Sequence, residues 1–389
     1  MQISASTPTP FPERLTPPLP REEFALDPGL VYLNHAAVGV LPIRTRDALH
    51  AFIDGHARRG VLGVYQHEND LPRYRAAAGA LIGARGEEIA FLRNTGDGAT
   101  IVARGLDVGP GDIIVTNRNE FGSNAYPWLA LRENGVEVRF VNAPHERMTP
   151  YVLAAQMNSK VKVVAVSWVT FDDGYRHDLA ALAEVAHAHG AIFAVDAIQA
   201  LGALPLDVNA CGIDVLYAGG AKWLMALQGV SLLYVRAGLH DRIATRLAGW
   251  RSVADIWDFL DYDQPWAPDA SRYEGGTPNI AGALALATSI DVLRAANVEA
   301  IGAHILALTD RLVEGLATKN TIVDSPRGPG ISSGIVRFRP AAGDPLELGK
   351  RLARAGIVTT NRATGIRVAP HGYNTTDEID ALLDLVPGR

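Results

Sequence analysis

The sequence predicts an α/β protein with a mostly parallel sheet flanked by helices, followed by a smaller α+β region. Three observations support this fold class. Short apolar runs suit strands covered on both faces, helical segments alternate with them, and the pattern changes after about residue 265. We therefore expect an N-terminal arm at 1–29, a large domain at 30–265 and a small C-terminal domain at 266–389, which part of the arm joins.

The first residues are rich in Pro, Ser and Thr and predict an irregular arm. The strands predicted for the large domain are almost continuously apolar, as buried parallel strands are. They span 112–116, 137–141, 161–168, 191–195, 214–218 and 230–235. A helix predicted over 178–189 stops at Gly190, a residue typical of a helix C-terminus.

The C-terminal region predicts a different order of elements. One or two helices over 279–317 precede a strand at 334–339, a helix at 345–355, a strand at 366–368 and a final helix from Thr376. This order suits a small α+β domain.

Composition excludes several classes of function. The net charge is −6, from 36 basic and 42 acidic residues, so the chain lacks the basic excess that nucleic-acid binding needs. Cys211 is the single cysteine, which excludes an internal disulfide and a multi-cysteine zinc site, and we predict no metal site. The N-terminus has no signal-peptide pattern, and no apolar run is long enough for a membrane span. We expect a soluble, cytoplasmic protein.

Lys222 is the most distinctive of five lysines, because it lies in the segment LYAGGAKWLMALQGVSLLYV between glycines and apolar residues. Burial lowers the pKa of a lysine, and a Schiff base needs the neutral amine. The alternative is a lysine whose amine reaches water from a loop between two strands.

Asp196 follows the apolar strand AIFAV, at the strand end where α/β sheets place ligands. Such a carboxylate either caps the next helix or holds a cofactor ring nitrogen in its protonated form. Gln199, three residues later, could then reach a neighbouring oxygen of the same ring.

Thr95 and Gly96 begin a helical run after the residues FLRN, and a helix N-terminus of this kind suits an anion. The same pattern is also an ordinary helix cap. No glycine fingerprint for dinucleotides follows a predicted strand, which weighs against a nicotinamide-dependent oxidoreductase.

These features follow one another as in the class V aminotransferase family of pyridoxal-phosphate (PLP) enzymes, which the sequence resembles from about Val31 to the last helix. That family includes cysteine desulfurases, kynureninases and isopenicillin N epimerases. The segments that carry the resemblance are YLNHAAVGVLP, NEFGSNAYPW, VDAIQALGALPLDV, GGAKWLMALQGVSLLYV, RYEGGTPN and IRVAPHGYNT. The resemblance implies a fold type I PLP-dependent transferase with pyridoxal 5'-phosphate as its cofactor.

The resemblance also implies roles for single residues around this cofactor. Lys222 would form the Schiff base and move protons at the substrate α-carbon, and Asp196 would hold the ring nitrogen. The other implied cofactor contacts are Gln199 at the ring oxygen, Phe121 at the ring face, Thr170 at the ring edge, and Thr95 and Gly96 at the phosphate.

Further implied residues concern the substrate and a second subunit. Arg367 would bind the substrate carboxylate with its planar guanidinium, and His35 is a further substrate contact, with His371 and Arg362 as additional candidates. Thr277 would reach the phosphate of a neighbouring subunit, which implies a homodimer with shared active sites.

The sequence departs from the desulfurases in four places. The segment GIVTTNRATGIR, ahead of Arg367, has no cysteine where desulfurases carry their nucleophile. Cys211 lies elsewhere, and we expect a buried, inert core thiol there. Ala221 stands where the relatives have His or Tyr, and Gly219 replaces a phosphate-binding serine. Phe121 stands where desulfurases have a histidine.

We therefore expect a PLP-dependent enzyme that acts at the α-carbon of an amino acid or a related amine. Transamination or epimerisation ranks first because the loop cysteine is absent. A carbon–sulfur lyase without that cysteine is an alternative, and a non-catalytic member that keeps the fold as a binding module is another.

Overall fold

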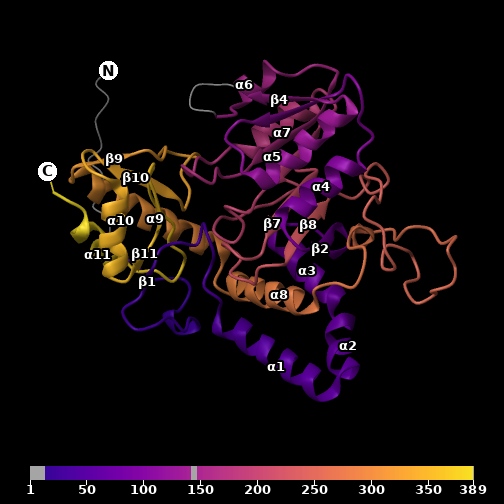
Figure 1. The fold of residues 1–389 in the computed structure, drawn as a ribbon, viewed down its shortest axis with the longest axis horizontal. Coiled ribbons are helices and arrows are strands. Elements are labelled where there is room, and N and C mark those ends of the chain that lie inside the picture. The colour runs from indigo at the N-terminus through magenta and orange to yellow at the C-terminus, as the bar shows by residue number, and fades with distance from the viewer. Residues whose placement is uncertain (1–13, 142–146, 389) are drawn as a thin grey trace, which may run out of the picture.

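The computed structural model describes residues 14–141 and 147–388. Among these residues, seven strands form the central sheet in the order β2-β8-β7-β6-β5-β3-β4 (Figure 1). The strands are β2 (Ile89–Leu92), β3 (Ile113–Asn117), β4 (Glu137–Val141), β5 (Val161–Ser167), β6 (Ile192–Asp196), β7 (Val215–Gly219) and β8 (Ser231–Val235). Only β8 within this sheet runs antiparallel to its neighbours.

Successive residues of each strand face two different hydrophobic clusters, because side chains alternate across a sheet. In β6, for example, Ile192 and Ala194 belong to one cluster, and Phe193 and Val195 to the other. One face is covered by α4 (Thr95–Gly105) and α5 (Gly122–Leu129). The other is covered by α3 (Leu71–Leu81), α7 (Leu179–His187) and α8 (Ile280–Ala295). Burial on both faces explains the continuously apolar strands.

A second, four-stranded sheet is antiparallel and lies beside the first (Figure 1). Its order is β12-β13-β10-β9, and its strands are β9 (Thr321–Val323), β10 (Val336–Pro340), β12 (Thr360–Arg362) and β13 (Gly365–Val368). Residues of α9 (Val298–Ala317), α10 (Pro345–Arg354) and α11 (Thr376–Leu385) share one core with it. The chain thus has the mostly parallel sheet and the smaller α+β domain that the sequence predicts, and the sheet of the smaller domain is antiparallel. The boundaries at 29 and 265 stay predictions.

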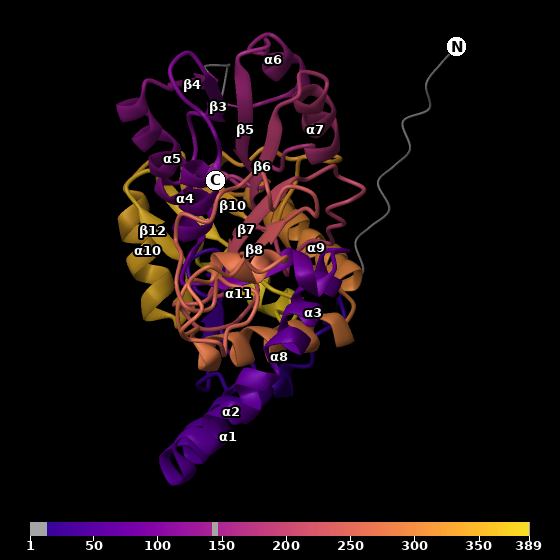
Figure 2. The ribbon, with the colours of Figure 1, turned by 90° about the vertical axis from the view of Figure 1, so that its right-hand side faces the viewer.

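The N-terminal segment joins the two parts of the molecule. The described residues of the arm form one short turn of 3-10 helix, η1 (Arg21–Glu23), and residues 1–13 of the predicted arm lie outside the described residues. Next, β1 (Val31–Tyr32) pairs in parallel with β11 (Ile357–Val358). Helices α1 (Ile43–Arg59) and α2 (Val61–Asn69) then project from the body (Figure 2).

The remaining described elements are short: η2 (Gly86–Glu88), η3 (Ala130–Asn134), α6 (Pro150–Ala154) and η5 (Ala270–Tyr273). The six predicted strands of the large domain are all present, each end within one residue. The sequence patterns did not predict β1, β2, β9, β11, β12 or the helices α1 to α3, α5 and α6. Within the described residues, no single helix is long and apolar enough to cross a membrane; α8 and α9 reach that threshold only as a pair bent by 78°.

Candidate active site

The parallel strands direct their carboxyl ends to one edge of the central sheet, and most predicted site residues follow those ends. Asp196 is the last residue of β6, where it lies in register between Ser167 of β5 and Tyr217 of β7. Lys222 follows β7, and Phe121 follows β3. This shared edge explains how residues a hundred positions apart come together.

Lys222 is half-buried and has no carboxylate partner within ion-pair distance among the described residues. Burial lowers its pKa to about 8, and the positive charge of Arg367 adds to this effect, whereas Asp196 opposes it. Its Nζ lies 5.5 Å from the centroid of the Phe121 ring. A lysine with this pKa is partly neutral near physiological pH, as Schiff-base chemistry requires.

Asp196 is 1% exposed and carries one free acceptor. Its Oδ1 accepts a hydrogen bond of 2.9 Å from the Ile198 amide, while the buried Oδ2 has no hydrogen-bond partner. Burial raises its pKa to about 6, against the opposing effects of the Ile198 N–H and Lys222. A buried acceptor without a partner costs about 1–3 kcal/mol. A protonated ring nitrogen is the kind of donor that satisfies it, so the site fits the predicted cofactor.

Gln199 is buried beside Asp196 and both ends of its amide are engaged. Its Nε2 donates to the Ala36 carbonyl at 3.1 Å, and its Oε1 accepts from the Trp223 indole at 3.1 Å. The amide nitrogen has two hydrogens, so one remains for a ring oxygen.

Thr95 and Gly96 occupy the first turn of α4, which Asn94 caps by accepting the Asp97 amide at 3.0 Å. The Thr95 hydroxyl accepts the Gly219 amide at 3.1 Å and keeps its own hydrogen for an anion. A Cβ atom on Gly219 would lie 3.2 Å from this hydroxyl. The helix start therefore offers a hydroxyl and unpaired amides, as the sequence predicts.

Phe121 is 45% exposed, which excludes simple core packing. Its ring meets that of Phe171 edge to face, with centroids 5.3 Å apart. Thr170, next to Phe171, is buried, and its hydroxyl accepts the Tyr175 amide at 2.8 Å and donates to Asp173. This hydroxyl is thus engaged within its own turn, and its predicted contact with a ring edge stays a prediction.

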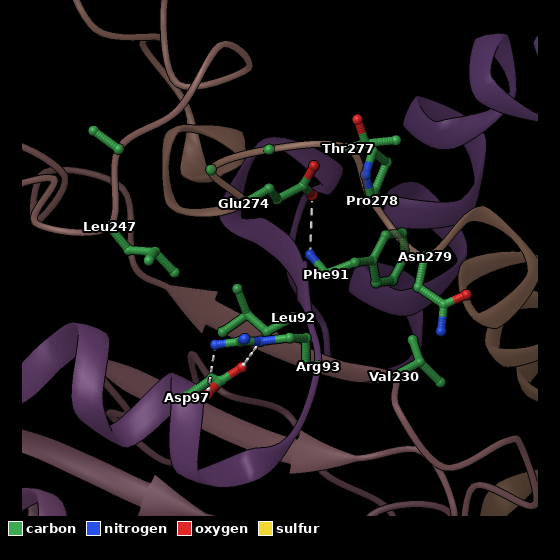
Figure 3. A pocket seen from close by; sticks show the side chains of 13 residues that line it. Phe91, Leu92, Arg93, Asp97, Val230, Leu247, Glu274, Thr277, Pro278 and Asn279 are labelled. Atoms are coloured by element: carbon green, nitrogen blue, oxygen red, sulfur yellow. Dashed lines mark hydrogen bonds and ion pairs between the residues drawn. The ribbon is translucent and has the colours of Figure 1, made fainter.

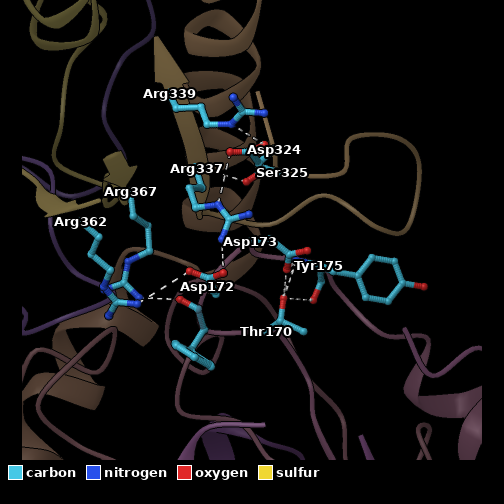
Figure 4. A network of polar contacts seen from close by, with 11 residues as sticks. Thr170, Asp172, Asp173, Tyr175, Asp324, Ser325, Arg337, Arg339, Arg362 and Arg367 are labelled. Carbon is cyan, nitrogen blue, oxygen red and sulfur yellow. Dashed lines mark hydrogen bonds and ion pairs between the residues drawn. The ribbon is translucent and has the colours of Figure 1, made fainter. Parts of the chain in front are cut away.

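Arg367 of β13 is buried beside the site without a carboxylate at ion-pair distance in the described part of the chain (Figure 4). It donates to the Phe171 carbonyl at 2.5 Å and to the Thr360 hydroxyl at 3.2 Å, while its Nε is buried without a partner. Burial and nearby Arg362 lower its pKa to about 10, and Asp172 opposes them. A buried guanidinium without a paired carboxylate favours the binding of an anionic ligand.

His35 is fully buried, and both of its ring nitrogens are engaged within the protein. Nδ1 contacts the Ala369 carbonyl and Nε2 the Tyr373 hydroxyl, each at 3.0 Å. Burial lowers its pKa well below the usual value, and His371 adds to the effect. A substrate contact by His35 stays a prediction, and this geometry favours a supporting role in the core.

Thr277 lies apart from these residues, on an exposed loop before α8 (Figure 3). It lines a cavity of about 250 Å³ together with Arg93, Asp97, Glu274 and Asn279. Neither Lys222 nor Asp196 lines this cavity. Within one chain, Thr277 thus lines a cavity that neither Lys222 nor Asp196 reaches, and its role toward a second subunit stays a prediction.

Sequence reasoning missed a buried polar network next to Phe121. Glu120 accepts the Ser167 amide and the Asn124 side-chain amide, each at 2.8 Å, and also the Ser167 hydroxyl. Burial raises the pKa of Glu120 to about 7; its hydrogen bonds oppose this effect, and Asp196 adds to it. The signal available was a carboxylate four residues after the predicted strand 112–116, a weaker form of the signal that identified Asp196, which follows its predicted strand directly.

Cys211 occupies a turn ahead of β7, whereas Lys222 follows the opposite end of that strand. The expectation of a fully buried core thiol is wrong, because Cys211 is only partly buried. Its side chain packs at the border of the core, where the turn reaches solvent. Burial, Asp207 and Asp178 all raise its pKa, which disfavours the reactive thiolate.

Comparison with known proteins agrees with this geometry. The family model Aminotransferase class-V matches residues 31–382. A probable cysteine desulfurase of Pyrococcus abyssi is 28% identical over 386 residues, covering 94% of this chain and 96% of the relative.

Two solved structures show the same fold. A cysteine desulfurase from Thermococcus onnurineus has a TM-score of 0.86 at 26% identity, covering 94% of this chain and 96% of its own. The cystine C–S lyase C-DES, in complex with cysteine persulfide, has a TM-score of 0.83 at 22% identity; the match covers 91% of this chain and 96% of the C-DES chain. The chain therefore belongs to the class V aminotransferase family, whose members are PLP-dependent enzymes.

Proposed function

We propose that this enzyme is a PLP-dependent carbon–sulfur lyase that cleaves a sulfur-containing α-amino acid and releases the sulfur product directly. The observation that carries the proposal is a set of three groups without full partners around one strand edge: the Lys222 amine, Asp196 Oδ2 and the Arg367 guanidinium. The desulfurase relatives support a sulfur substrate, so we rank this reaction ahead of the transamination or epimerisation expected from the sequence.

Direct release follows from the position of the only cysteine. A persulfide carried by the enzyme needs a thiolate near the substrate sulfur. Cys211 lies at the opposite end of β7 from Lys222, and its raised pKa favours the thiol. The sulfur product would then leave without an enzyme-bound carrier.

The residues of the site would hold the cofactor in a defined way. Asp196 would accept a hydrogen bond from the protonated ring nitrogen, and the Gln199 amide nitrogen would donate one to the ring oxygen. Thr95 and Gly96 would donate hydrogen bonds to the phosphate, and Phe121 would lie at the ring face. Bound PLP supplies an electron sink for the charge that develops at the substrate α-carbon.

The chain's own groups would then act on the substrate. Arg367 would bind the α-carboxylate and fix the orientation of the α-carbon. Lys222, whose lowered pKa makes the amine a usable base, would accept the α-proton. Positioned proton transfer of this kind contributes about 10²–10⁴-fold to a rate.

We also propose a homodimer with shared sites, in which the exposed loop around Thr277 reaches the phosphate position of the partner. The exposure of Thr277 and its place in a cavity that Lys222 does not line support this arrangement.

A panel of amino acids tests the reaction. Incubating the holoenzyme with L-cysteine, L-cystine, S-alkyl-L-cysteines and L- and D-alanine, each with and without added 2-oxoglutarate as amino acceptor, separates the alternatives by their products. Pyruvate, ammonia and a released sulfur compound indicate the lyase. Amino transfer to a keto acid indicates an aminotransferase, and an amino acid of inverted configuration indicates an epimerase. If no compound gives a product, the result indicates the non-catalytic binding module.

The attachment site has its own test. Borohydride reduction of the holoenzyme followed by peptide mapping should place the pyridoxyl group on Lys222. A label on any of the other four lysines would remove the basis of the proposed mechanism.

A further inference from the structure

A second arginine lies next to Arg367 on the same hairpin. In the pairing of β12 with β13, Thr360 is opposite Arg367 and Arg362 is opposite Gly365. Residues 360 and 362 of a strand share a face, so Arg362 is a diagonal neighbour of Arg367. The influence of Arg362 on the pKa of Arg367 agrees with this proximity, and Figure 4 shows both side chains extending toward Asp172.

Nearby carboxylates do not fully neutralise this pair. Asp172 is 3.7 Å from Arg362 but already forms a closer ion pair with Arg337 of β10. Asp173 is engaged by the Thr170 hydroxyl and the Tyr175 amide. The Arg362 side chain stays 45% exposed, so a ligand can reach its guanidinium.

Two aromatic rings connect Arg362 with Lys222. The Arg362 guanidinium carbon lies 5.9 Å from the centroid of the Phe171 ring. Phe171 contacts Phe121 edge to face, and Phe121 lies 5.5 Å from the Lys222 amine. An apolar wall thus runs from the reacting lysine to the second arginine, while Arg367 holds the backbone of Phe171.

We propose that Arg362 binds a second anionic group at the far end of the substrate side chain. The preferred substrates are then α-amino acids with an apolar spacer and a distal carboxylate or sulfonate: the spacer lies along Phe121 and Phe171, and Arg367 takes the α-carboxylate. The inference names the substrate class of the proposed lyase and in that respect rests on the proposed function.

Binding of two unreactive acids of equal length tests the inference without any turnover. Calorimetry on the holoenzyme compares glutarate, which has two carboxylates, with pentanoate, which has one. The wild type should bind glutarate about tenfold more tightly, equivalent to about 1.4 kcal/mol. Arg362→Gln should remove this preference and leave pentanoate binding unchanged, whereas Arg362→Lys should keep most of it.

Arg339→Gln is the matched control, because Arg339 belongs to the same arginine cluster but pairs only with Asp324 among the described carboxylates. It should leave the binding of both acids unchanged. Equal binding of glutarate and pentanoate by the wild type, or an equal loss of both in Arg362→Gln, would overturn the inference.

Turnover then separates this inference from the proposed function. Pyruvate release is compared for S-methyl-L-cysteine and for L-cysteine carrying a carboxyethyl group on sulfur. Release from neither compound, with the glutarate preference intact, contradicts the lyase and supports the anion site. Release from both without preference, together with equal acid binding, contradicts only the anion site.

Discussion

Gly39 lies directly against the backbone of Lys222. Its N–H donates to the Ala221 carbonyl at 2.7 Å, and a Cβ atom at this position would lie 2.2 Å from the Lys222 carbonyl oxygen. That oxygen already accepts the Met225 amide at 3.0 Å. The N-terminal segment therefore supports the loop that holds the lysine, and only a residue without a side chain fits there.

Gly39→Ala should displace the Lys222 loop, because a backbone carbonyl cannot move aside as a flexible side chain can. Overpacking of this kind costs about 1–3 kcal/mol. We expect a lower melting temperature and weaker retention of the cofactor, measured by thermal unfolding and by the visible absorbance of the holoenzyme. Gly109→Ala is the matched control, since a Cβ there meets no atom within 4 Å. Full cofactor retention in Gly39→Ala would contradict the role of this contact.

Asp196→Asn should stabilise the cofactor-free protein at pH 8. The pKa of Asp196 is raised from 3.8 to about 6 in the folded state, so its ionised form is less favourable there than in the unfolded chain. The unfavourable contribution is absent below about pH 4, grows between pH 4 and 6, and is complete above pH 6, where it amounts to about 3 kcal/mol.

Urea unfolding of both proteins across this pH range measures the effect. The advantage of Asp196→Asn should shrink toward zero as the pH falls through the same window. The exposed Asp291, changed to Asn, serves as the control and should change stability little at any pH. A variant less stable than the wild type at pH 8 would contradict the unfavourable burial of this carboxylate.

The sequence predicts the part of the site that follows from strand order. Lys222, Asp196 and Thr95 each stand next to the end of a strand or the start of a helix, and parallel strands bring such positions to one edge. Those strands can be recognised in the sequence as continuous apolar runs, because both faces of the sheet are buried. The short strand β2 was not predicted, because four residues are too few to show a recognisable pattern of apolar residues.

Contacts between distant segments could not be predicted in the same way. The support of Lys222 by Gly39 and the hydrogen bond of 2.7 Å from Thr360 to Asn34 depend on how remote segments of the chain pack. The Glu120 network depends on the register of β5, which brings the Ser167 amide and hydroxyl to that carboxylate. Helices α1 and α2 approach each other closely at Gly55 and Gly63. No periodic pattern in the sequence predicts this contact.

Cys211→Ser should keep the full activity of the enzyme. The thiol lies at the opposite end of β7 from Lys222 and does not favour its thiolate form, so it has no part in the proposed chemistry. The measurement is the rate of sulfur release from the best substrate of the amino-acid panel, with Lys222→Ala as the inactive reference. Loss of turnover in Cys211→Ser, with the fold intact by circular dichroism, would restore the carrier mechanism of the desulfurases.

Mixing two defective variants tests whether the sites are shared between subunits. Thr277→Val should bind the cofactor weakly, because it removes a hydroxyl from the phosphate, and Lys222→Ala should be inactive. If Thr277 serves the partner's site, a mixed dimer contains one site with both native residues and one with neither.

Co-expression with two affinity tags allows the mixed dimer to be isolated and assayed at limiting cofactor. With free exchange of subunits, about a quarter of all sites in an equal mixture regain both residues. The purified mixed dimer should therefore show about half of the wild-type activity per dimer, far above either parent. If Thr277 instead acts in its own chain, each site of the mixed dimer keeps one defect, and no activity returns. Mixing the double variant with the wild type provides the control: there Lys222 of the wild-type chain meets Val at 277 of its partner, so a shared site predicts weak cofactor binding in every mixed dimer.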